Sequence, residues 1–198
     1  MADSFLTRAS GPAAPLLSVA EAKEQAHIDH GDDDARLEAY VAAANAMIDG
    51  DGVLGRALIT QTWCLTLSAP PRERFMRLPM PIVQSVSGVT YYDETNMEQT
   101  FAASNYRLVS QPEHGLLELV DGANWPNTYR RADAMSVEYV TGYGDTAADV
   151  PADIRQAAAL LVAYWYDNRS AATERGWEAM PFGVRALLGK HRLVRGYI

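Results

Sequence analysis

The stretch VPADIRQAAALLVAYWYDNR, residues 150–169, predicts a long helix that is apolar on more than one side. Pro151 suits the first helical position, where its missing amide would be unpaired in any case. From Ala157 to Tyr166 the stretch has almost no polar break. Other protein must cover such a helix. The cover can come from the chain's own core or from a neighbouring copy, and these alternatives imply different functions.

Helical spacing divides this stretch into two faces. We expect one face to join a helical core with the predicted N-terminal helices; it comprises Ile154, Ala158, Leu161, Val162 and Trp165. The other face would be partly exposed in an isolated domain. It could meet the next copy in a ring or the chain's own predicted β section; the candidate ring-interface residues are Ala157, Leu160, Tyr164 and Arg169.

Two further helices are predicted near the N-terminus, after a flexible arm at residues 1–15. Ser18 and Glu21 have the spacing of a capping box, which predicts that a helix starts here. Residues 32–34, all aspartates, supply a cap and first-turn acidic side chains for a second helix. The apolar face of that helix comprises Leu37, Tyr40, Val41, Ala44, Met47 and Ile48.

The hydrophobic periodicity changes at residue 59. In residues 60–67, Trp63, Leu65 and Leu67 alternate with small or polar side chains, which is strand spacing. Further short strands are predicted at 83–93, 99–101, 106–109, 116–120 and 135–141, separated by segments rich in turn residues. Their close spacing indicates a small antiparallel sheet or barrel.

We therefore expect an α+β fold, in which a helical body carries an inserted small antiparallel β section. The body would consist of an N-terminal helix pair and a long C-terminal helix. The predicted parts are a flexible arm at 1–15, N-terminal helices at 16–58, the inserted β section at 59–144, C-terminal helices at 145–189 and a tail docking segment at 190–198.

The composition is typical of a soluble globular domain, with 48% hydrophobic and 21% charged residues in 198. The formal net charge is −8, but residues 169–198 carry six basic and two acidic side chains. The acidic remainder argues against tight DNA binding, whereas the basic segment would suit nucleic acid or an acidic protein surface. The longest apolar run is about half the ~20 residues that a membrane helix needs. With no secretory signal at the N-terminus, we expect a soluble protein made in the cytoplasm with no membrane partner.

No pattern in the sequence indicates an active site. Cys64, the single cysteine, is interpreted as a small buried thiol. Residues 49–52 begin like a calcium loop, but Thr60 stands where that loop needs a glutamate. Residues 27–34 gather two histidines and four aspartates, for which a solvated interhelical loop is the preferred interpretation. We expect no catalytic residue, no cofactor and no metal; a hydrolytic enzyme built on residues 27–34 is the least favoured hypothesis.

Four groups of segments are distinctive when taken in order. They are LSVAEAK (17–23); GRALITQT (55–62) after the turn at 49–52; LPMPIVQSV (78–86) leading to VTYYD (89–93); and VEYVTGYG (137–144) followed by VPADIR (150–155) and YWYDNR (164–169). The ordered set resembles the head–tail connector (adaptor) proteins of long-tailed phages and gene transfer agents. The resemblance covers roughly residues 16–190.

The resemblance implies a structural protein of the virion neck. Its relatives form a ring, usually of twelve copies, beneath the portal protein of a DNA-filled head. They contact a stopper or another tail-proximal neck protein, and DNA passes through their channel without specific binding. In related adaptors the C-terminal segment packs along the portal. Carried over to this chain, the portal-docking candidates are Arg185, Lys190, Arg192, Leu193, Val194, Arg195, Tyr197 and Ile198.

Two alternatives remain open at the level of sequence. One is a nucleic-acid-binding packaging factor that uses the basic side chains of residues 175–195. The other is a different neck protein, such as a stopper or a tail terminator. Proteins of that second kind are usually dominated by sheets, whereas this chain is predicted to begin and end with helices.

Overall fold

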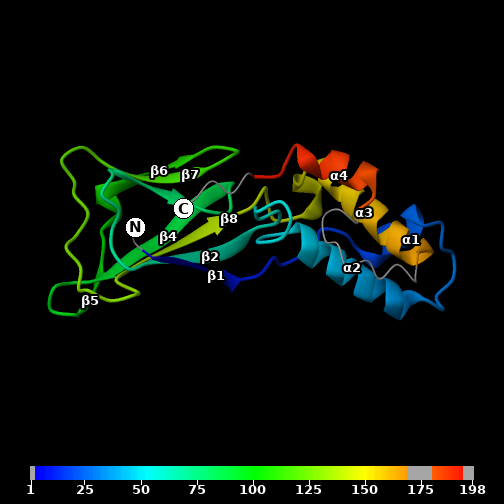
Figure 1. Ribbon diagram of the computed structural model, residues 1–198, viewed down its shortest axis with the longest axis horizontal. Coiled ribbons are helices and arrows are strands. Elements are labelled where there is room, and N and C mark those ends of the chain that lie inside the picture. Colours follow the sequence, from blue (N-terminus) through cyan, green and yellow to red (C-terminus); the bar gives the residue numbers. More distant parts are fainter. Residues whose placement is uncertain (1–2, 169–179, 194–198) are drawn as a thin grey trace. The chain divides into compact units, whose positions relative to one another are not determined.

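The computed structural model describes residues 3–168 and 180–193. The described chain divides into two compact units (Figure 1). One, the β unit, consists of residues 3–11 and 60–142; the other, the helical unit, consists of residues 12–59, 143–168 and 180–193. The chain therefore enters the β unit twice, and the helical unit is assembled from segments on both sides of it.

The helical unit is built from α1 (Val19–Gln25), α2 (Asp34–Ile48), α3 (Ala152–Asp167) and α4 (Phe182–Gly189). A capping box starts α1 as predicted: Ser18 N donates to Glu21 Oε2 at 2.8 Å, and Glu21 N donates to Ser18 Oγ at 3.3 Å. Pro151 is the N-cap of α3 and lies one position earlier than predicted. Asp33 is the N-cap of α2 but makes no capping hydrogen bond with its side chain; its carboxylate instead accepts from Tyr166 Oη at 2.7 Å.

One apolar cluster forms the core of the helical unit. α3 packs against α1, α2 and α4, and the predicted core face of α3 supplies Ile154, Ala158, Leu161 and Val162, each at most 1% exposed. Asn45 fixes the start of α1 on α2, because its side-chain amide exchanges two 3.2 Å hydrogen bonds with the backbone of Leu17. The predicted apolar face of α2 is confirmed, with Leu37, Val41, Ala44 and Ile48 buried.

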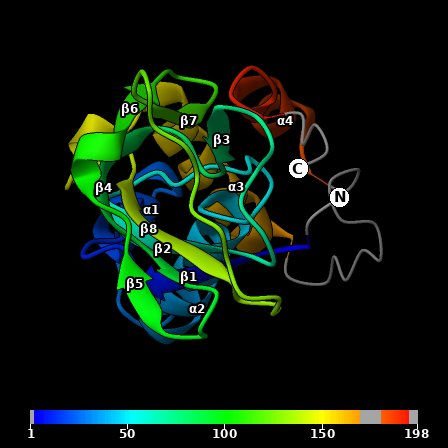
Figure 2. The same ribbon diagram turned by 90° about the vertical axis from the view of Figure 1, so that its left-hand side faces the viewer.

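The β unit contains two antiparallel sheets (Figures 1 and 2). The five-stranded sheet has the order β1 (Ser4–Ser10), β2 (Gln61–Leu67), β8 (Met135–Thr141), β4 (Val83–Tyr92), β5 (Glu98–Thr100). The three-stranded sheet has the order β3 (Phe75–Leu78), β7 (Gly115–Leu119), β6 (Tyr106–Ser110). Two short 3-10 helices complete the fold, η1 (Ala103–Asn105) in this unit and η2 (Ala147–Asp149) in the helical unit.

The two sheets pack face to face as a sandwich. Alternate residues of β2 and β8 are buried, which places Trp63 and Leu65 on the inner face. A side chain on Gly115 of β7 would lie 2.4 Å from Val83 Cγ2 of β4, so the sheets approach too closely there for any other residue. Near the β5 end of the sandwich, Phe101 stacks on Tyr106 with ring centroids 6.0 Å apart.

The predicted fold class is wrong in its proportions. Within the described residues, eight strands form two antiparallel sheets beside four α-helices, so the protein is sheet-rich rather than a helical body with a small β section. Ser4–Ser10, expected in a flexible arm, forms β1 and pairs with β2. β3 was also not predicted. β3 has only four residues, and β1 joins a partner more than 50 positions away, which local pattern cannot reveal.

Candidate assembly surfaces

The predicted ring face of α3 is only partly available for contact. Ala157 has no exposed surface and belongs to the core cluster, so it is removed from the candidate interface. Leu160 and Tyr164 are half-buried. Arg169 lies outside the described residues. At Ala157, this second face of α3 therefore packs in the chain's own core, because α3 contacts three other helices.

The start of the predicted docking segment is held on α3 by a carboxylate. Asp153, in the first turn of α3, forms an ion pair with Lys190 Nζ. The same oxygen, Oδ2, lies 2.9 Å from His191 Nε2. Leu193 N donates to the carbonyl of Leu54 at 3.0 Å. Residues 190–193 thus belong to the helical unit, although the sequence predicts a separate docking segment from residue 190 onward.

The electrostatics of Asp153 follow from these contacts. Burial alone would raise the pKa of this carboxyl, but hydrogen bonds from Lys190 and His191, together with their charges, hold it at about 2. The carboxylate side chain is 19% exposed, so water screens the pair only in part. Asp153 therefore remains ionised across the physiological range and tethers the segment that follows α4.

The remaining docking candidates fall into two groups. Arg185 on α4 is half-buried, and Arg192 is exposed. Val194, Arg195, Tyr197 and Ile198 lie outside the described residues. The described part of the docking segment is therefore Lys190–Leu193, which is held on the helical unit. It follows α4, the helix that carries Arg185.

An exposed aromatic residue on α4 was missed by the sequence reasoning. Phe182, the first residue of α4, is 80% exposed, the largest exposure among the large apolar side chains of the described chain. Gly183 and Ala186 beside it are also exposed. Val184 and Leu188 are the buried residues of this short helix. Their four-residue spacing could have shown that Phe182 falls on the opposite face.

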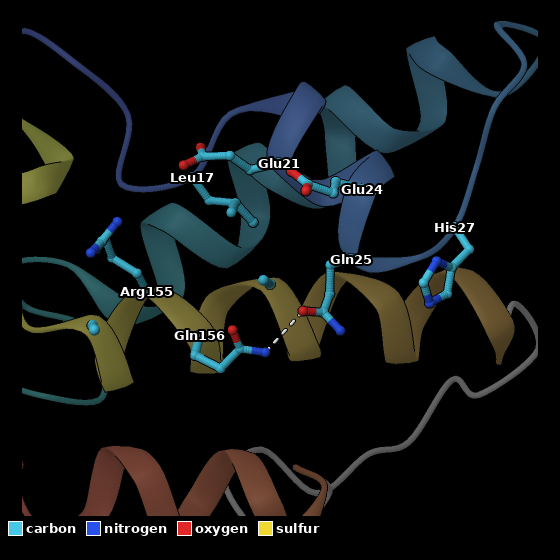
Figure 3. Close-up of a pocket in the computed structure, with 9 residues that line it drawn as sticks. Leu17, Glu21, Glu24, Gln25, His27, Arg155 and Gln156 are labelled. Carbon is cyan, nitrogen blue, oxygen red and sulfur yellow. Dashed lines mark hydrogen bonds between the residues drawn. The ribbon is translucent and has the colours of Figure 1, made fainter.

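An open groove of about 430 Å³ runs between α1 and α3. Figure 3 shows Gln25 and Gln156 facing each other across it, and Gln156 Nε2 donates to Gln25 Oε1 at 2.9 Å. Glu21 and Arg155 line the same groove. The pKa of Glu21 is lowered by its hydrogen bonds with Ser18 and, to a smaller extent, by the charge of Arg155. The carboxylate of Glu21 is therefore committed to capping α1 and is a poor candidate for acid–base chemistry.

The structure gives structural roles to the motifs that superficially resembled metal sites. Within residues 3–168 and 180–193, no three His, Cys, Asp or Glu side chains gather in a way that could hold a metal ion. Asp49 caps the end of α2, and its Oδ1 accepts from Leu58 N at 2.8 Å. Cys64 is half-buried beside the hydroxyls of Thr66 and Ser136. No helix in the described ranges is long and apolar enough to cross a membrane.

The comparison with family models matches residues 15–194 to the model "Head completion protein". The chain belongs to the head completion protein family. The match covers both the helical unit and most of the β unit, so it concerns the whole architecture rather than one motif. No curated protein matches the chain.

Three solved structures of gene transfer agent particles contain chains that are similar to this one. The chain is 29% identical, with a TM-score of 0.78, to a chain of "Virion of native gene transfer agent (GTA) particle". It is 27% identical, with a TM-score of 0.76, to a chain of "Neck of empty GTA particle computed with C6 symmetry". It is 30% identical, with a TM-score of 0.75, to a chain of "Neck of native GTA particle computed with C12 symmetry".

Each similarity covers 98% of this chain and 97% of the other chain. The match therefore includes both units of this head completion protein and leaves no large insertion on either side. The relation to head–tail connector proteins that the sequence predicts is confirmed.

Proposed function

We propose that the chain is a structural protein of the head–tail neck and works as the adaptor ring beneath the portal of a phage-like particle. One observation carries the proposal: end-to-end similarity, at 30% identity, to a chain of a gene transfer agent neck. The role is assembly rather than catalysis, in agreement with the family description.

The proposed ring contains twelve copies of the chain. The C12 symmetry of one similar neck structure supports this number. The C6 symmetry of another is compatible with it, because a twelve-fold ring also has six-fold symmetry. The proposed partners are the portal protein on the head side and a stopper or other tail-proximal neck protein on the tail side.

The channel through the ring would carry DNA without gripping it. A net charge of −8 supports this part of the proposal, because an acidic surface repels phosphates. The alternative of a packaging factor that binds nucleic acid loses support, since Lys190, one of its basic side chains, is paired with Asp153. A salt-dependent affinity for duplex DNA would revive it.

The proposed portal contact combines α4 with the segment that follows it. Phe182 supplies an exposed aromatic anchor of the kind that dominates protein interfaces. Arg185 lies on the same helix, and the tether of Lys190 and His191 to Asp153 fixes where the segment leaves the helical unit. Residues 194–198 continue from that point and complete the docking candidates.

The function is tested by producing particles in cells that lack the chain and then supplying variants of it. Without the chain we expect DNA-filled heads that carry no tail. With it, cryo-electron microscopy should show a ring in direct contact with the portal. A ring that touches only tail-side proteins would make the chain a stopper instead, and particles without the chain between head and tail would end the proposal.

The docking segment is tested by deleting residues 194–198 from the full chain. We expect an unchanged circular dichroism spectrum, because no described contact is removed, and loss of binding to isolated portal rings. Arg130→Ala, at an exposed position of the β unit, is the matched control and should bind normally. Undiminished portal binding by the truncated chain would contradict the assignment of the docking segment.

A further inference from the structure

The outer face of the five-stranded sheet carries little charge over β1, β2 and β8, although Glu98 lies on the same face at the β5 edge. Register places Thr7, Cys64 and Glu138 in one row across β1, β2 and β8, and Phe5 and Thr66 in the next. Glu138 is the one charged side chain on this face of β2 and β8, and within the described chain it has no ion-pair partner. Phe5 is 54% exposed. A sheet face in water usually carries several charges, whereas the centre of an interface is poor in charge and rich in aromatics.

The outer face of the three-stranded sheet has a complementary composition. Phe75 and Arg77 of β3 point away from the sandwich core, because Met76 and Leu78 between and beside them are buried. Phe75 is 42% exposed. In the same row as Phe75, Arg107 and Glu118 neutralise each other through a 2.7 Å ion pair. Arg77 is thereby left as the unbalanced charge of this face, and no described residue forms an ion pair with it.

We propose that these two faces are the two halves of one interface between copies of the chain. The face with Phe5 and Glu138 would pack against the face with Phe75 and Arg77 of the next copy. The two faces lie on opposite sides of one sandwich, so the contact is head-to-tail and can close into a ring. This inference rests on the proposed function for the existence of a ring, and it names the surfaces that build it.

The occupant is a second copy because each face supplies what the other lacks. Each has one exposed aromatic residue, and their unbalanced charges are opposite: Glu138 on one side and Arg77 on the other. A buried contact between the two would pair charges that are unpaired in the single chain. Two identical faces brought together would instead oppose Glu138 to Glu138 or Arg77 to Arg77, which disfavours a two-fold dimer through either face.

Cross-linking in assembled particles tests the pairing. A full-length Cys64→Ser chain carries Arg77→Cys and Glu138→Cys together, and particles that contain it are treated with a short bis-maleimide. We expect a ladder of covalent oligomers, because each copy presents one cysteine to each neighbour. Chains that carry Arg77→Cys alone or Glu138→Cys alone should stay monomeric in the same treatment.

The outcomes separate the interface from the function. Particles that contain the double-cysteine chain but give no ladder would refute the interface and leave the proposed function intact. Dimers from a single-cysteine chain, or cross-links to a different neck protein, would also refute it. Complete absence of the unmodified chain from assembled particles would refute the proposed function and the interface together.

Charge reversal gives a second test that needs no new cysteine. Glu138→Arg should reduce incorporation into particles by about tenfold, since every contact would then oppose two arginines. Adding Arg77→Glu to the same chain should restore incorporation. Glu113→Arg makes the same change of charge in the β6–β7 turn, off both faces, and should incorporate normally. Failure of the double variant to recover, with a melting temperature like that of the unmodified chain, would contradict the pairing.

Discussion

The helical unit and the β unit bury their cores by different means and leave different surfaces exposed. In the helical unit, four helices share one apolar cluster, and the exposed aromatic Phe182 lies on α4, close in sequence to the docking segment. In the β unit, two sheets cover each other on one side only, which leaves an aromatic residue on each outer face, Phe5 and Phe75. These surfaces fit the two proposals above. Phe182 of the helical unit would contact a different protein, and the two outer faces of the β unit would contact other copies of the chain.

The largest expected effect tests whether the units are independent. Leu161→Ala removes a side chain that is 1% exposed at the centre of the helical cluster. We expect it to lower the free energy of unfolding by about 3 kcal/mol, through lost burial and the cavity left behind. Hydrogen exchange should show faster opening of amides in α2 and α3, with β2 and β8 unchanged. Equal loss of protection in both units would show that they unfold together, which would contradict the independence of their two cores.

The tether at Asp153 has an intermediate expected effect and a pH dependence. Its folded-state pKa of about 2 is lower than the usual value, so its stabilisation is present above the unfolded-state pKa and lost as pH falls toward 2. Asp153→Asn should lower stability by about 1–2 kcal/mol at pH 7. In denaturant titrations the difference from the unmodified chain should shrink as pH falls below the unfolded-state pKa and should vanish only below the folded-state pKa of about 2.

The control for this tether is Asp145→Asn, at an exposed position of the same unit. It should leave both the stability and its pH profile unchanged. A difference between Asp153→Asn and the unmodified chain that persisted at the lowest pH would point to packing rather than charge. In that case the carboxylate would not be what holds Lys190 and His191.

The smallest expected effect on stability concerns Phe182. Because this side chain is 80% exposed, Phe182→Ser should change the free energy of unfolding by less than about 0.5 kcal/mol. Binding of the full chain to portal rings should nevertheless fall strongly, since an exposed aromatic anchor would be lost. Met97→Ser, which removes a 62% exposed apolar side chain from the β unit, should leave portal binding intact. Equal effects of the two substitutions on portal binding would contradict the proposal that the helical unit, and not the β unit, contacts the portal.

Several local features could be read from the sequence because their causes are local. The capping box at Ser18 and Glu21 depends on residues three positions apart. The apolar face of α2 and the alternation in β2 follow from helical and strand periodicity. The order of characteristic segments was enough to indicate the family. For the assembly surfaces, however, the sequence offered only two lists of candidate residues, one on the helix at 157–169 and one near the C-terminus.

The tertiary structure decided what those residues are available to do. Ala157, expected at a ring interface, is enclosed by the chain's own helices, because the number of neighbours around α3 cannot be deduced from its periodicity. Lys190, expected to be free for docking, is paired with Asp153 across 37 positions of sequence. β1 became a strand through pairing with distant β2, which placed Phe5 at the edge of the five-stranded sheet. Sequence pattern thus determined which residues form helices and strands locally, while long-range packing and pairing decided which surfaces remain for assembly.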